Sequence, residues 1–87
     1  MLFQVNMTVR IPHDVDAATV DQLRAEEHGR AEELRRQGKW LHVWRVAGKW
    51  ANLSIFDVES PTELHQIVCT LPLYPYMDVE VTALCPM

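Results

Sequence analysis

Apolar and polar side chains alternate strictly over residues 2–11, at the start of the chain. A period of two residues is typical of a strand that buries one of its faces. Proline has no backbone N–H to donate to a sheet, so Pro12 is expected to end this strand. The buried face would carry the apolar set Phe3, Val5, Met7, Val9 and Ile11.

Two later stretches carry the signals of helices. Residues 16–37 fit a helix that Asp16 caps and that the chain leaves at Gly38 through a left-handed residue. A second helix is expected to begin at Pro61, because the segment Ser60-Pro61-Thr62-Glu63 has the form of a capping box with proline at the first helical position. This helix ends before Pro72, and residues 71–77 are too rich in proline for a regular element.

Residues 41–46 and 50–56 are strand-like and are joined by an Ala47-Gly48 turn, which predicts a hairpin. Residues 77–83 form the last expected strand. The resulting order, βαββαβ, indicates a single α+β domain over residues 1–87 with a ferredoxin-like fold: an antiparallel four-stranded sheet with two helices on one face. Trp44 or Trp50 on the uncovered face would leave an apolar patch, which predicts a dimer or larger assembly.

The charge of the chain narrows the classes of partner. It has 12 acidic and 8 basic residues, a formal net charge of -4, and no cluster of basic side chains. Binding to the phosphates of a nucleic acid requires a cluster of Lys and Arg on one face, so no nucleic acid partner is expected. No apolar run approaches the roughly 20 residues of a membrane span, so we expect no membrane contact and a cytoplasmic location. A chain this short is also expected to need a neighbouring subunit to form a deep cleft.

Metal and disulfide chemistry have little support in the sequence. Cys69 and Cys85 have neither CxxC spacing nor a disulfide framework, and buried or idle thiols are the expectation. The histidines show no metal-ligand spacing, so no metal is expected.

A carboxylate interrupts the apolar stripe of the long helix. The stripe runs through Val20, Leu23, Ala31 and Leu34, and Glu27 occupies its central position. A carboxylate withdrawn from water has a raised pKa, which suits it to act as a general base near neutral pH. The alternative is that Glu27 borders the stripe and extends to solvent.

Other candidate residues each have a plain structural alternative. His28 would supply an orienting donor or a second titrating group, or would be a surface histidine. Arg45 would bind a substrate carboxylate in a bidentate fork, or pair with a surface acid. Asn52 and Ser54 share one face of a strand and would donate hydrogen bonds inward, or be ordinary strand residues. Tyr76 would line a mouth or an interface.

The segments MLFQVNMTVRIP, GKWLHVWRVAGKWANLSIFDV and LPLYPYMDVEV resemble the muconolactone isomerase family, small ferredoxin-like enzymes of the 3-oxoadipate pathway. The resemblance covers nearly the whole chain. It implies a homodecamer built from dimers, clefts between subunits, no cofactor, and a small lactone substrate. It also implies that Glu27 matches the catalytic carboxylate of the family.

Several positions depart from the family pattern. His28 stands where a lysine is usual, and Trp50 and Leu53 stand where tyrosines are usual, all near the expected substrate site. The sequence stops at Met87, where the family usually continues, which suggests a more open cleft. These departures favour a chlorinated substrate, and the expected activity is that of 5-chloromuconolactone dehalogenase, which removes the C4 proton and expels chloride to give cis-dienelactone.

Three alternatives to this activity remain open from the sequence. The first is muconolactone isomerisation to the enol-lactone. The second is a non-enzymatic ferredoxin-like ligand-binding or assembly module, although an appended DNA-binding segment or a basic face would mark it and neither is present. The third is a monooxygenase, cofactor-free or haem-linked, on the same kind of dimeric barrel.

Overall fold

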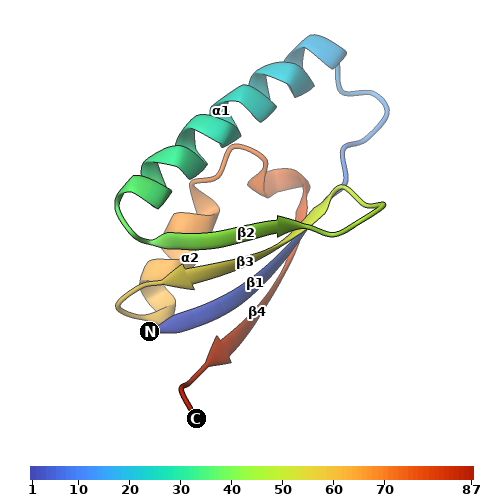
Figure 1. The fold of residues 1–87 in the computed structure, drawn as a ribbon. Helices are drawn as coiled ribbons and strands as arrows, with labels where there is room; N and C mark the ends of the chain where they lie inside the picture. Colours follow the sequence, from blue (N-terminus) through green and yellow to red (C-terminus); the bar gives the residue numbers. More distant parts are fainter.

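The computed structural model describes residues 1–87 and has the expected order of elements (Figure 1). Four strands and two helices follow one another along the chain, with a short 3-10 helix, η1, before the last strand. Their bounds are β1 Leu2–Val9, α1 Ala17–Arg36, β2 Trp40–Arg45, β3 Ala51–Asp57, α2 Pro61–Cys69, η1 Tyr74–Tyr76 and β4 Met77–Leu84.

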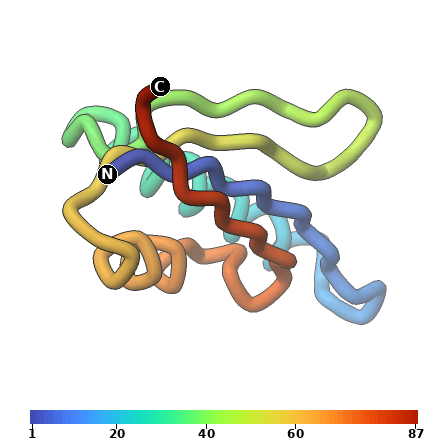
Figure 2. Tube along the Cα trace, turned by 90° about the horizontal axis from the view of Figure 1, so that it is seen from below, coloured from blue at the N-terminus to red at the C-terminus, as the bar shows by residue number.

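The four strands form one antiparallel sheet in the order β2-β3-β1-β4, which confirms the ferredoxin-like prediction. The first strand lies at the centre, and β2 and β4 form the two edges. In Figure 2, the β2–β3 hairpin lies at the opposite edge of the sheet from β4. Helix α1 contacts β2, so it covers the hairpin side of the sheet.

One face of the sheet and both helices build the core. Alternate residues of β1 point to the helices, and they are fully or almost fully buried, as the period of two predicts. Trp40 stacks on Phe56 with ring centroids 4.8 Å apart, and its buried indole N–H has no hydrogen-bond partner. The core cluster is Phe3, Val5, Met7, Leu34, Trp40, Phe56, Val58, Leu64, Ile67, Val68 and Leu71.

The exit from α1 is a Schellman motif. The N–H of Gly38 donates to the carbonyl of Arg35, and the N–H of Lys39 donates to that of Leu34, each at 3.0 Å. Gly38 has φ +74°, so the predicted left-handed residue is confirmed. At the other end Asp16 occupies the N-cap position, but its side chain accepts no cap hydrogen bond, so the predicted capping role is wrong.

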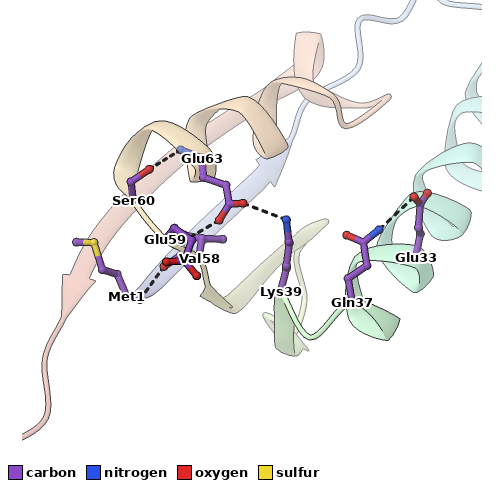
Figure 3. A network of polar contacts seen from close by, with 8 residues as sticks. All are labelled: Met1, Glu33, Gln37, Lys39, Val58, Glu59, Ser60 and Glu63. Carbon is purple, nitrogen blue, oxygen red and sulfur yellow. Dashed lines mark hydrogen bonds and ion pairs between the residues drawn. The ribbon is translucent and has the colours of Figure 1, made fainter.

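The start of α2 is tied to the exit from α1 by a polar network (Figure 3). The Ser60 hydroxyl accepts from the N–H of Glu63 at 3.1 Å, which confirms the predicted cap. The Glu63 carboxylate accepts from the N–H of Glu59 at 2.8 Å and from Lys39 Nζ at 3.0 Å. These donors, the Glu59 N–H first, lower the pKa of Glu63.

The element bounds differ from the predictions by one or two residues, apart from the region of η1. The first strand ends at Val9 rather than residue 11, and the hairpin strands are Trp40–Arg45 and Ala51–Asp57, so Trp50 lies in the turn. The segment 71–77, expected to be irregular, contains a 3-10 turn in which the N–H of Tyr76 donates to the Leu73 carbonyl at 2.9 Å. Pro75 lies at the start of this turn, where a backbone N–H would have no partner within the helix, so the missing N–H of proline costs no hydrogen bond.

The uncovered face carries Trp44, which is 55% exposed and stacks on His42 with ring centroids 5.3 Å apart. Trp50 is not on this face; it lies on the helix side, beneath Arg24. Neither helix has the length and apolar content needed to cross a bilayer.

Candidate active site

The largest cavity lies between α1 and the β2–β3 hairpin and has a volume of about 790 Å³. Helix α1 contacts the sheet mainly at β2, and residues of α1 and of the β2–β3 hairpin form most of the cavity wall. Its lining is Arg24, Glu27, His28, Ala31, Glu32, Arg35, Trp40, Val43, Arg45, Gly48, Lys49, Trp50, Asn52 and Leu73.

Glu27 is a half-buried carboxylate in the wall of this cavity. Its Oε1 accepts a hydrogen bond of 2.9 Å from the backbone N–H of Leu73. Burial raises the pKa of Glu27 above its ordinary value of 4.5, and the Leu73 N–H opposes this only in part. The predicted partial burial of Glu27 is therefore confirmed, and the carboxyl is suited to accept a proton and return it.

The donor to Glu27 is 46 positions away in the sequence, in the segment between α2 and η1. The 3-10 turn places the carbonyls of Leu71 and Leu73 in hydrogen bonds of 2.9 Å to Tyr74 and Tyr76. The N–H of Leu73 is left free to face α1, and its buried side chain holds the segment in place. One carboxylate oxygen is thereby fixed, and Glu27 Oε2 has no protein hydrogen-bond partner.

Asn52 and Ser54 lie on the helix-facing side of β3, opposite Met7 and Val5 in the register. Asn52 lines the cavity, whereas Ser54 is fully buried behind it. The Ser54 hydroxyl donates to Asn52 Oδ1 at 2.7 Å. Because the amide oxygen is engaged in this way, the NH₂ group of Asn52 is the end left free to donate.

Arg45, His28 and Trp50 also line the cavity, so the structure brings five of the seven predicted site residues together. Arg45 lies at the end of β2, and its Nη1 donates to the Lys49 carbonyl at 3.4 Å. His28 is exposed on α1. Ser54 and Tyr76 do not line the cavity; Ser54 contacts it only through Asn52, and Tyr76 is half-buried in η1.

Several side chains of the cavity wall are not among the residues predicted from the sequence. Arg24 lies over the Trp50 ring, with the guanidinium carbon 4.1 Å from the ring centroid. Arg35 pairs with Glu32 at 4.0 Å, and Lys49 extends from the hairpin turn. Arg24 precedes Glu27 by three residues, a spacing that puts both on one face of the helix and could have identified it.

Net positive charge surrounds the carboxylate. The lining contains four basic residues, Arg24, Arg35, Arg45 and Lys49, against two acidic ones, Glu27 and Glu32. None of the ion pairs in the structure involves Glu27. The cavity thus suits a small organic anion that meets a carboxylate base.

The cysteines lie outside this cavity. Both are exposed, so of the two expected alternatives, buried or idle, the buried one is wrong. Cys69 Sγ is 3.4 Å from His65 Nε2. No three His, Cys, Asp or Glu side chains are gathered closely enough to share a metal ion.

A ferredoxin-like sheet whose helix presents a half-buried carboxylate to a cation-rich cavity fits the class of small acid–base enzymes. Comparison with known proteins gives the family. The family model for muconolactone delta-isomerase matches residues 1–87. The chain belongs to the muconolactone delta-isomerase family, and it is an isomerase-type enzyme.

Curated relatives agree over almost the whole chain. Muconolactone Delta-isomerase 2 of Acinetobacter lwoffii is 53% identical over 85 residues, which are 98% of this chain and 88% of that protein. Muconolactone Delta-isomerase of Pseudomonas putida is 51% identical over 85 residues, with the same shares of the two chains. A crystal structure of muconolactone isomerase superimposes with a TM-score of 0.95 at 52% identity and covers 100% of this chain and 91% of that one.

The predicted dehalogenase activity is wrong. The relatives at about half identity are muconolactone delta-isomerases. A chloride-eliminating neighbour, 5-chloro-2-hydroxyhydroquinone dehydrochlorinase from Burkholderia phenoliruptrix, has a TM-score of 0.67 and only 20% identity, so it shares the fold alone. The departures at His28, Trp50 and Leu53 therefore do not indicate dehalogenation.

Proposed function

We propose that this protein is a muconolactone delta-isomerase, which converts muconolactone to the 3-oxoadipate enol-lactone in the catechol branch of the 3-oxoadipate pathway. The observation that carries the proposal is the half-buried Glu27 carboxylate, which the Leu73 N–H orients in the cavity wall. The names of the relatives supply the substrate.

The reaction is a proton transfer across three carbons of the lactone ring. The C4–H bond breaks, its proton joins the Glu27 carboxylate, and the electron pair spreads into the lactone carbonyl as a dienolate. The Glu27 carboxyl then returns the proton to C2, and the C2=C3 double bond becomes C3=C4. One carboxyl group serves as base and then as acid, so the reaction consumes no other reagent.

The dienolate oxygen needs a hydrogen-bond donor, because a carboxylate is too weak a base to hold this proton against a carbanion in water. The free NH₂ group of Asn52 faces the cavity and supplies a neutral donor, which Ser54 orients. His28 supplies a second donor from α1, where the family usually has lysine. A preorganised donor of this type typically contributes about 10²–10³ in rate.

The cations of the cavity wall hold the acetate carboxylate of the substrate. Arg45 extends from β2 with a fork of N–H groups, of which one contacts the Lys49 carbonyl. A guanidinium binds a carboxylate through two parallel hydrogen bonds, which fixes the orientation of the lactone ring.

We further propose that copies of the chain assemble into a homodecamer built from dimers, as the family resemblance implies. The support from the structure is the edge strand β2 and the residue that follows it, where apolar side chains are left open to solvent: Leu41, Val43 and Trp44 in the strand and Val46 just after it. A second copy that covers this edge would also shield the cavity, whose hairpin wall is exposed. The two exposed free thiols favour a reducing, cytoplasmic location.

The direct test is to incubate the purified protein with muconolactone and follow the enol-lactone by absorbance and NMR. We expect rapid formation of the enol-lactone and, in D₂O, deuterium at C2 to the extent that the Glu27 carboxyl exchanges its proton with solvent before it returns the proton. A protein that leaves muconolactone unchanged at micromolar concentration, although it is folded by circular dichroism, would overturn the proposal.

A further inference from the structure

Among the arginines of α1, Arg24 alone lines the cavity without forming an ion pair, since the unpaired Arg36 lies outside the cavity. Arg30 pairs with Glu33 at 3.4 Å, and Arg35 pairs with Glu32 at 4.0 Å, so both are paired to acids of their own helix. Arg24 forms no ion pair or hydrogen bond within the chain, and its guanidinium lies over the ring of Trp50. A cationic side chain in the cavity wall is thus held in place without having its N–H groups used.

The stacking on Trp50 determines which part of Arg24 is available. A guanidinium over an aromatic face is attracted by the ring quadrupole, while its N–H donors lie in its own plane and point to the side. Those donors match the two oxygens of a carboxylate. Trp50 lies in the hairpin turn, so this contact also spans the cavity from α1 to the opposite wall.

The chemistry of the proposed substrate sets how far its anchor can be from the base. The acetate carboxylate is attached through one CH₂ group to C4, the carbon that loses its proton. A cation that holds this carboxylate must therefore lie near Glu27, and residues three apart on a helix have Cβ atoms about 5–6 Å apart. Arg24 has this spacing from Glu27. A cation here also offsets the repulsion between the base and the substrate anion.

We propose that Arg24 is a substrate-binding residue of this enzyme, which holds the acetate carboxylate, and that Trp50 positions its guanidinium for this contact. The inference rests on the proposed isomerisation and adds the residue pair that sets the preference for an anionic lactone. Arg24 acts beside Arg45, which reaches the cavity from the sheet.

The test compares muconolactone with its methyl ester, which keeps the reacting ring and removes the negative charge. Arg24→Gln should lower kcat/KM for the acid by about 10- to 100-fold, mainly through KM, because a charged hydrogen-bonded contact is lost. For the ester the same change should cost less than about 3-fold. Arg36→Gln is the matched control, since it removes the same charge from the exposed end of α1 outside the cavity.

Trp50 is tested in the same assay. Trp50→Phe keeps a ring face and should retain most of the preference for the acid, whereas Trp50→Leu should reduce it several-fold. In the Arg24→Gln background, Trp50→Leu should not reduce the acid-over-ester preference any further, because the guanidinium that Trp50 positions is already absent. If the wild-type protein isomerises muconolactone and Arg24→Gln keeps the acid-over-ester preference, the inference is wrong while the proposed function stands. If the wild-type protein has no turnover, both fail.

Discussion

The replacement of Glu27 by glutamine separates the chemistry of the site from its structure. The amide keeps an oxygen at the position of Oε1, so it can still accept the 2.9 Å hydrogen bond from the Leu73 N–H. It cannot accept a proton from carbon. General acid–base catalysis typically contributes about 10²–10⁴ in rate, and we expect Glu27→Gln to lose at least that much turnover of muconolactone.

The same variant should be as stable as the wild-type protein at low pH and more stable near neutral pH. Burial raises the pKa of Glu27 in the folded state, so the folded protein binds this proton more tightly than the unfolded chain does. Stability then falls as pH rises from about 4.5, the ordinary value, through the folded pKa. Glutamine does not titrate and escapes this loss. The acid limb of kcat/KM should likewise lie above pH 4.5.

Two assays test this prediction: enol-lactone formation, and thermal unfolding measured in steps from pH 4 to pH 8, a range that begins below the ordinary pKa of 4.5 and extends well above it. Glu26→Gln is the control, because Glu26 is the exposed neighbour whose side chain only accepts from Gln22 at 3.3 Å. It should keep wild-type turnover. Residual activity above about a tenth of wild type in Glu27→Gln, or a difference in Tm between the two proteins that does not change with pH, would refute the reasoning.

Other variants test the donor and the fold. Ser54→Ala should lower kcat about 5-fold with little change in KM, because one hydrogen bond of about 1 kcal/mol no longer orients Asn52. Asn52→Leu should lower kcat about 10²–10³-fold, because the donor itself is lost. Equal losses of kcat in the two variants would disprove this division of roles. Ser60→Ala removes the N-cap of α2 and should cost about 1 kcal/mol, or about 4–8 °C in Tm by calorimetry. Gly38→Ala meets no atom within 4 Å but forces alanine to φ +74°, and should lower Tm by a similar amount. Gly29→Ala also meets nothing within 4 Å and should instead raise Tm, since alanine is the better helix former; an opposite order of the two glycine variants would contradict the conformational argument.

The fold could be predicted from the sequence because each element carries its own local signal. The period of two in β1, the left-handed exit at Gly38 and the Ser60 cap depend on residues adjacent in the chain. Asp16 shows the limit of such reasoning: the residue type fits a cap, yet its side chain accepts no bond. The ends of the strands shifted because pairing with neighbours, rather than local pattern, decides them.

The site could be predicted only where residue type conflicts with pattern. Glu27 interrupts an apolar stripe, and this conflict identified it. Arg24 gave no such signal, because its contact with Trp50 joins a helix to a distant hairpin turn and an arginine on a charged helix looks like any solvated one. Strand parity placed Asn52 and Ser54 on one face but could not show which of the two reaches the cavity.

Single departures from a family pattern carry less information about the reaction than the similarity of the whole chain does, which is why the predicted dehalogenase activity is wrong. His28, Trp50 and Leu53 differ from the usual family residues, but about half of all aligned positions agree with muconolactone delta-isomerases. A change of the neighbouring donor from lysine to histidine leaves the Glu27 carboxylate and its hydrogen bond from the Leu73 N–H in place. Both reactions would begin with removal of the C4 proton by the same carboxylate, so Glu27 does not distinguish them, whereas the similarity of the whole chain does.

The hydrogen bond from Leu73 to Glu27 has a consequence for how this enzyme tolerates sequence drift. The donor is a main-chain N–H, which every residue except proline possesses. A point mutation at position 73 thus changes how well the segment packs, but nineteen of the twenty amino acids still offer the proton that orients the base. The proposed base Glu27, which relies on the backbone in this way, is insulated from most single-codon changes in its partner, and a substitution at position 73 alters the packing of a buried side chain instead.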